Sequence, residues 1–233
     1  MALIVPKYIC NRFCRLRQRL FAAKHGGMIN ASHKMTARPT AQHADGRRER
    51  SRSSRSKFVA ALLDLVGKGE VAPSAAGVAE VAGVGLRSVF RHFDDMDELY
   101  REMGEAIETQ VMPIILEPPT GATWREKLFD IADRRAMVFE TILPYRISAN
   151  LKRFQSPYLM QDYRRTLRLE QETAEAHLPL AVKADVAGTR GLNVILSFQT
   201  WRLLRHDQEL PFEDAKAVVR RLLSDAISSM PED

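Results

Sequence analysis

Residues 78–99 read VAEVAGVGLRSVFRHFDDMDEL, a stretch in which glycines separate two short helical patterns. Ser74, just upstream, is a residue type that caps helix N-termini, so we expect a short helix to begin there. The run Gly83-Val84-Gly85 ends that helix. On the helix that follows, Val89 and Phe93 are four residues apart and face inward. The pattern predicts two short helices joined by a tight turn.

The outer face of the second short helix is basic and polar. Arg87 with Arg91, and Ser88 with His92, form i, i+4 pairs on the side away from Val89. An amphipathic helix precedes both, with an inward face made of Phe58, Ala61, Leu62, Leu65 and Val66. Together the three helices predict a helix-turn-helix over roughly residues 56–93, whose last helix would contact DNA. An ordinary helical protein with exposed arginines is an equal alternative at this point.

Basic residues are concentrated near the N-terminus. Residues 1–57 contain 14 of the 35 lysines and arginines but only Asp45 and Glu49 among the 29 acidic residues. The rest of the chain is acidic overall, although the net charge is +6. Such a segment fits a disordered tail, a membrane-surface segment or an arm that neutralises DNA phosphates. Because it leads into the predicted helix-turn-helix, we favour the DNA arm.

Composition and motifs exclude several other classes of protein. The chain has 233 residues, 45% hydrophobic and 27% charged, as expected for one large or two small folded domains. No stretch approaches the roughly 20 apolar residues of a membrane span, and no secretory signal is present, so we expect a cytoplasmic protein with no membrane partner. Cys10 and Cys14 lack a second pair, which disfavours zinc or disulfides. In the absence of catalytic motifs, we expect no enzyme, cofactor or metal.

The rest of the chain is also predicted to be helical, so the expected fold class is all-α. Prolines separate expected helices at 95–116, 123–141, 144–154, 158–178, 183–207 and 212–229. We expect three parts, namely a basic, disordered extension at 1–46, a helix-turn-helix domain at 47–100 and a helical ligand-binding and dimerisation domain at 101–233.

The last two predicted helices carry much apolar surface. A helix over residues 192–204 would be apolar on almost every side, and the helix from Phe212 has a broad apolar face. One side can pack on its own domain while the other meets a second subunit, which gives a four-helix bundle. A fully buried central helix in a monomer is the alternative. The residues expected at the dimer contact are Leu196, Trp201, Leu204, Val219, Leu222 and Leu223.

The stretch from Val78 to Leu99 resembles the TetR/AcrR family of repressors. The family pattern is Ile-Ala, two residues, Ala-Gly-Val-Ser, then a recognition helix reading Gly-Thr-Leu-Tyr-x-His-Phe. Gly69 and Ser74 extend the match upstream. More loosely, Ser197 to Ile227 resembles the pair of helices through which these proteins dimerise.

The resemblance implies a set of DNA-contacting residues. Leu86, Arg87, Ser88 and Arg91 would face base edges, where arginine can bond both acceptors of guanine and Leu86 can lie against a thymine methyl. Phosphates would be contacted by the last residue of the helix and by the start of the helix before it. The full set is Ser74, Leu86, Arg87, Ser88, Phe90, Arg91 and His92.

Three positions depart from the family pattern. Gly85 replaces a Ser and loses a cap, Phe90 replaces a Tyr, and Met96 replaces a Lys that contacts phosphate. The aspartates within 94–97 would repel DNA if they faced it. The arginines of residues 38–57 can restore the attraction, so we expect unusual salt sensitivity.

The resemblance implies a transcriptional regulator, by family default a ligand-responsive repressor that binds a palindromic operator in double-stranded DNA as a homodimer. A small-molecule effector of unknown identity would move apart two recognition helices that must lie about 34–36 Å apart on DNA. The second hypothesis is a helical small-molecule sensor or interaction protein that has lost specific DNA binding. The absence of the Lys at Met96 favours it.

Overall fold

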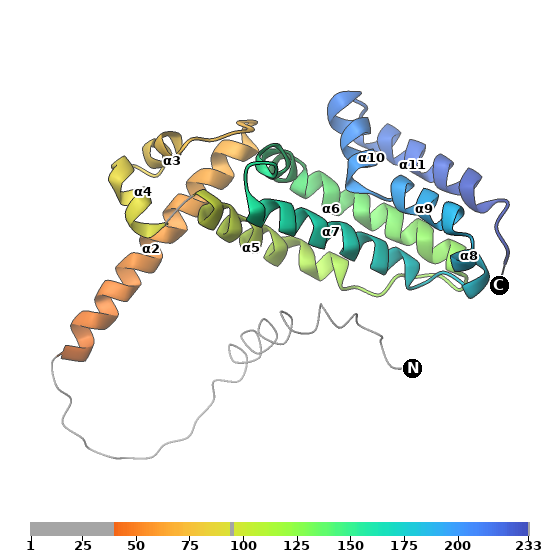
Figure 1. Cartoon of the computed structure of the whole chain (residues 1–233), viewed down its shortest axis with the longest axis horizontal. Helices are drawn as coiled ribbons and strands as arrows, with labels where there is room; N and C mark the ends of the chain where they lie inside the picture. Colours follow the sequence, from red (N-terminus) through yellow and green to blue (C-terminus); the bar gives the residue numbers. More distant parts are fainter. Residues whose placement is uncertain (1–39, 94–95, 233) are drawn as a thin grey trace, which may run out of the picture. The chain divides into compact units, whose positions relative to one another are not determined.

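All secondary structure is helical in the part of the chain that the structure describes. This computed structural model describes residues 40–93 and 96–232, with side chains from Ser53 onward. The all-α fold class is confirmed, and no described helix is long and apolar enough to cross a membrane. Figure 1 shows the elements in chain order, which are α2 Thr40–Gly67, α3 Ala75–Val81, α4 Leu86–His92, α5 Met96–Ile115, α6 Trp124–Lys152, α7 Pro157–Glu175, α8 Leu180–Ala184, α9 Val186–Ile195, α10 Phe198–Arg202, the π-helical η1 Leu203–Asp207 and α11 Phe212–Ile227.

Helix α2 begins at Thr40 and not at Ser56, where the sequence predicts it. The added turns, residues 40–55, contain five arginines and two alanines, which favour helices. Residues 40–46, which were expected to be disordered, therefore belong to a helix. Further along α2, the predicted inward face is buried in the core through Phe58, Ala61, Leu62 and Val66.

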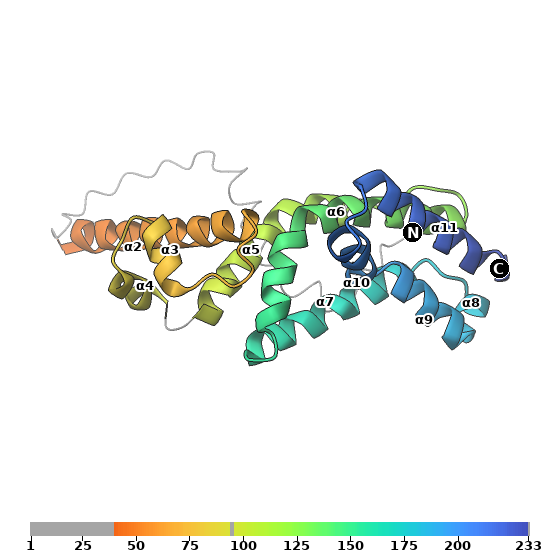
Figure 2. The same cartoon turned by 90° about the horizontal axis from the view of Figure 1, so that it is seen from above.

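Helices α3 and α4 lie beside α2 in both views of the molecule (Figures 1 and 2). Val78 of α3, Val89 of α4 and Phe93, which follows α4, are buried. Phe93 meets Phe58 of α2 edge to face, with 5.9 Å between ring centroids. This aromatic contact joins the end of α4 to α2.

Helices α5 and α6 each contain a proline. α6 continues through Pro144, where the sequence predicts a break between 123–141 and 144–154, so that prediction is wrong. A proline removes one backbone donor, but the turns on either side keep the helix intact with a bend, as Figure 2 shows. α5 crosses the predicted domain boundary at residue 100, and one of its stripes is buried through Leu99, Met103, Ile107 and Val111.

The predicted helix at 183–207 is divided into α8, α9, α10 and η1, so the single long helix is wrong. Asp185 begins α9 by accepting a hydrogen bond from Gly188 N at 3.0 Å. Ser197 begins α10 by accepting one from Thr200 N at 3.2 Å. These short polar side chains cap new helix starts and interrupt the apolar run.

The core of the C-terminal helices forms where α6, α9, α10 and α11 meet. Phe139 of α6 packs edge to face on Phe198 of α10, with 5.6 Å between centroids. Trp201 and Phe212 form a second such pair at 5.5 Å. Because α5 packs on α6, the helix that follows α4 is attached to this core.

Candidate nucleic-acid interface

The turn between α3 and α4 is built from a cap and two glycines. Ser74 Oγ accepts a hydrogen bond from Gly77 N at 3.1 Å, so its predicted N-cap role is confirmed. Gly83 has a φ of +68°, in the left-handed region that glycine tolerates because it has no Cβ. Gly85 caps α4 without a side-chain hydrogen bond, as expected from the loss of a Ser there.

The outer face of α4 combines two arginines with two apolar side chains. Arg87 and Arg91 are exposed, and neither forms an ion pair with another described residue. Leu86 and Phe90 are 44% and 55% exposed. Val89, on the opposite side, is buried and holds the helix to the core. Arginine donors beside apolar groups can contact guanine edges and thymine methyls.

His92 ends α4 and lies against the core. Its ring centroid is 5.6 Å from that of Phe58. Desolvation, followed by the charges of Arg91 and Arg55, lowers the pKa of His92 below its ordinary value. The imidazole is therefore mainly neutral at pH 7, and a phosphate contact would use a ring N–H without a full charge. Ser88, four residues earlier, is half-buried.

The residues after α4 are turned toward the protein where the structure describes them. Met96 is partly buried against the core, so packing accounts for an apolar residue at this position. Asp97 accepts a hydrogen bond from Ser156 Oγ at 2.6 Å, which directs its carboxylate to the start of α7. Asp94 and Asp95 lie outside the described residues.

Of the predicted basic arm, the structure describes side chains only near its C-terminal end, from Ser53 onward. Side chains of residues 40–52 lie outside the described part, so their DNA contacts remain predictions. Arg55, which the sequence places in the same arm, bonds to Glu98, Glu102 and the His92 carbonyl. These contacts within the protein engage its guanidinium, whereas its predicted role in the DNA-binding arm stays a prediction.

Similarity to known proteins is found in the fold of this chain and not in its sequence. No family model matches the sequence, and no curated protein matches it. A transcriptional regulator from Rhodococcus sp. RHA1 has a similar solved structure, with a TM-score of 0.55 and 18% identity over 76% of this chain and 97% of that one. A TetR transcriptional regulator from the same organism gives a TM-score of 0.49 and 14% identity over the same shares. The chain therefore shares its overall fold with the first of these regulators.

Most residues expected at the dimer contact are buried within the chain. The α9–α10 segment lies against α6 and α11, and one side of it is buried through Leu192, Leu196, Phe198 and Trp201. Most of these residues therefore pack within the chain's own core, because hydrophobicity alone does not distinguish a chain's own core from a partner's, and their part in a dimer contact stays a prediction. Leu222 is exposed, whereas the buried members are Leu196, Trp201, Leu204, Val219 and Leu223.

A different face of α9 is exposed. Val186, Arg190 and Val194 lie four residues apart on one side, with Ala187 and Gly191 beside them. Val186 and Val194 are 68% and 66% exposed. A Cβ added at Gly191 would meet no atom within 4 Å. We call these five residues the α9 face, a small and largely apolar surface.

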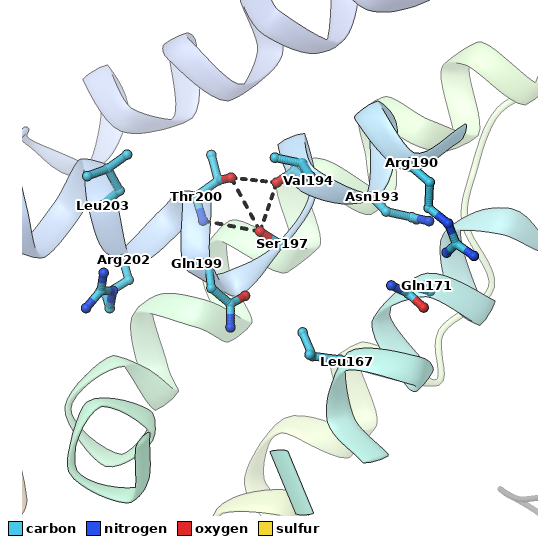
Figure 3. Close-up of a pocket in the computed structure, with 10 residues that line it drawn as sticks. All are labelled: Leu167, Gln171, Arg190, Asn193, Val194, Ser197, Gln199, Thr200, Arg202 and Leu203. Carbon is cyan, nitrogen blue, oxygen red and sulfur yellow. Dashed lines mark hydrogen bonds between the residues drawn. The ribbon is translucent and has the colours of Figure 1, made fainter. Parts of the chain in front are cut away.

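A groove of about 520 Å³ runs beside the α9 face, between α7 and the segment α9–α10–η1 (Figure 3). Val194 and Leu203 supply apolar groups, while the hydroxyls of Ser197 and Thr200 both donate to the Val194 carbonyl. Two arginines and three amides complete the polar lining, which contains no acidic residue. The groove can accept apolar groups that carry hydrogen-bonding atoms. No group of His, Cys or acidic residues in the described chain is arranged to hold a metal ion.

The first turns of α5 contact the C-terminal helices directly. Tyr100 Oη and Ser148 Oγ of α6 lie 2.9 Å apart in a buried hydrogen bond, and burial raises the pKa of Tyr100. Lys152 Nζ of α6 donates to the Pro73 carbonyl at 3.4 Å, next to the start of α3. With the bond from Asp97 to α7, these contacts link the α3–α4 region to the C-terminal core.

Two features of the site were not predicted from the sequence. Glu98 and Glu102 are an acidic i, i+4 pair, a signal that a basic side chain from another helix can bind there. The four-residue spacing of Val186, Arg190 and Val194 likewise marks one helix face. Both signals are present in the sequence, but neither shows which element lies opposite.

Proposed function

We propose that this chain is a DNA-binding transcriptional regulator in which α4 contacts base edges in the major groove. The outer face of α4 carries the proposal, since Arg87 and Arg91 are exposed there beside Leu86 and Phe90. An α-helix fits the major groove, where arginine can bond O6 and N7 of guanine and apolar groups can meet thymine. The fold shared with a transcriptional regulator from Rhodococcus supports this function.

The other proposed contacts act mainly at the DNA backbone. Ser74 is exposed, and its hydroxyl accepts from Gly77 N, which leaves its own proton available to a phosphate. His92 can donate one ring N–H. Half-buried Ser88 would reach a base only where α4 approaches closely. Contacts to phosphates set position, whereas contacts to bases set sequence preference.

We propose that the protein acts as a homodimer assembled through the α9 face and the groove beside it. Val194 and Leu203 are exposed there, and burying them on a second copy would remove apolar surface from water. Ala187 and Gly191 present little bulk, so two α9 helices can approach closely. A two-fold dimer places the same face on both copies and favours a palindromic operator with half-sites one DNA turn apart.

We propose further that a ligand bound among the C-terminal helices releases the operator, so that the protein is a ligand-responsive repressor. A ligand that favours another spacing of the two α4 helices lowers DNA affinity by linkage. A movement of α6 or α7 can reach α4 through the Tyr100–Ser148 and Asp97–Ser156 bonds, because these bonds join α6 and α7 to α5, the helix that follows α4.

The proposed function is tested by selecting preferred duplexes from a random pool with the full-length protein. We expect enrichment of a palindromic site that binds at least about 10³-fold more tightly than a scrambled duplex at physiological salt. Affinity for both duplexes should fall steeply as salt rises. A pool from which no sequence is enriched would contradict the proposal.

A helical sensor or interaction protein without specific DNA binding is the second candidate. Gly85 gives α4 no side-chain cap, and Met96 packs on the core where a cation would hold a phosphate. Under this alternative, the selection yields no preferred site. Replacing Arg87 and Arg91 by Ala would then leave the protein's cellular effect unchanged.

A further inference from the structure

Arg55 joins three helices. It lies on α2, and its guanidinium donates to Glu98 and Glu102 of α5, with Nη2–Oε1 and Nε–Oε1 distances of 2.7 and 2.8 Å. Nη1 donates to the carbonyl of His92, the last residue of α4. The Arg55 Cζ also lies 4.4 Å from the ring centroid of Phe93. The side chain therefore contacts both the end of α4 and the start of α5.

The chemistry of arginine suits this position. A guanidinium carries five N–H donors in a rigid fork, and four hydrogen bonds to protein acceptors use that fork here. The His92 carbonyl belongs to the last turn of α4, where carbonyls lack partners within the helix and a positive charge is favourable. The side chains of Arg55, Glu98 and Glu102 are only 28–30% exposed.

We propose that Arg55 is a positioning residue for α4 and not a DNA contact. The inference rests on the proposed function, because the orientation of α4 affects sequence preference only if α4 contacts bases. A phosphate would have to displace a carboxylate or a carbonyl to bind Arg55. Since α4 has only seven residues and no side-chain cap at Gly85, the bonds at its far end help buried Val89 to fix its orientation.

The same two turns of α5 also contact the C-terminal helices. Asp97 and Tyr100 bond to the α7 N-cap and to α6, while Glu98 and Glu102 bond to Arg55. A displacement of α5 therefore moves the acceptors of Arg55 and, through its bond to the His92 carbonyl, the end of α4. Sequence preference, more than general DNA affinity, should depend on this connection.

The test compares full-length wild type, Arg55→Ala and Lys57→Ala on the selected and the scrambled duplex across salt. Lys57 is exposed on the same helix and belongs to the basic segment, so Lys57→Ala is the reference for a phosphate contact and should weaken binding to both duplexes equally. Each protein is measured at a temperature at which circular dichroism shows it to be folded. We expect Arg55→Ala to weaken binding to the selected duplex about tenfold, with unchanged scrambled binding and an unchanged salt slope. An equal loss on both duplexes with a smaller slope would identify a phosphate contact and overturn the inference.

The double variant Glu98→Gln, Glu102→Gln gives an independent readout, because it weakens the Arg55 contacts without removing its charge. Positioning predicts a loss of preference for the selected duplex, as in Arg55→Ala. A phosphate contact predicts tighter binding to both duplexes, since the surface becomes less acidic and Arg55 is released. Arg55→Lys keeps the charge but not the fork, so its preference should resemble that of Arg55→Ala.

The outcomes separate this inference from the proposed function. If the wild type prefers neither duplex, the proposed function fails, and the inference fails with it. If the wild type prefers the selected duplex and every folded Arg55 and Glu variant keeps that preference, only the inference fails.

Discussion

At the scale of single residues, the two glycines beside Val84 have different roles. Gly83 has a left-handed φ of +68°, whereas Gly85 has an ordinary φ of −71°. A Cβ added at either position would meet no atom within 4 Å. The need for glycine at position 83 therefore comes from the backbone conformation and not from packing.

Gly83→Ala should lower the free energy of unfolding by about 1 kcal/mol, because an L residue is strained in the left-handed region. Gly85→Ser should raise it by a few tenths of a kcal/mol by supplying the missing cap. Urea unfolding of both variants and the wild type measures these changes. Equal midpoint shifts for Gly83→Ala and a Gly85→Ala control would contradict the assignment.

His92 should make stability depend on pH. Desolvation lowers its folded pKa below the ordinary value of 6.5. The unfolded chain therefore takes up its proton at a higher pH than the folded protein does, and stability falls as pH drops from 6.5 through the folded pKa. His92→Gln should reduce this loss, which urea unfolding at a series of pH values measures. An identical pH dependence in the variant would rule out this role.

At the scale of helices, the α3–α4 region could be predicted well because its signals are local. The cap at Ser74, the turn at Gly83 and the spacing of Val89 and Phe93 each act within a few residues. The cap at Ser197 was missed because the surrounding apolar run favours one continuous helix. Continuation through Pro144 was missed because a proline can either end a helix or bend it, and the local sequence does not distinguish the two.

The α9 face predicts a dimer that can be broken without unfolding the monomer. Gly191→Arg places a long side chain where no atom of the chain lies within 4 Å, so folding should be retained. Two apposed α9 helices would clash, and we expect the variant to be monomeric. Gly104→Arg on α5, equally open, is the matched control and should remain dimeric. Sedimentation measures both, and a dimeric Gly191→Arg would contradict the proposed interface.

At the scale of the whole molecule, charge is unevenly distributed, because the N-terminal segment is basic and the rest of the chain is acidic. Residues 1–57 contain 14 of the 35 basic residues, but at least one of them serves the fold. The internal role of Arg55 could not be predicted, because its partner Glu98 lies 43 residues away along the chain. The exposed Arg87 and Arg91 could be predicted, since helical spacing places them opposite buried Val89.

The most direct test of the central claim, that the outer face of α4 contacts bases, is the ratio of affinities for the selected and the scrambled duplex at one salt concentration. Arg87→Ala with Arg91→Ala should lower this ratio about 10- to 100-fold or more, since a bidentate contact to a base gives roughly 1–3 kcal/mol of discrimination. Arg164→Ala with Arg168→Ala removes the same charge from exposed positions on α7 and should leave the ratio unchanged. An unchanged ratio in the α4 variant, or an equal fall in the control, would contradict the account.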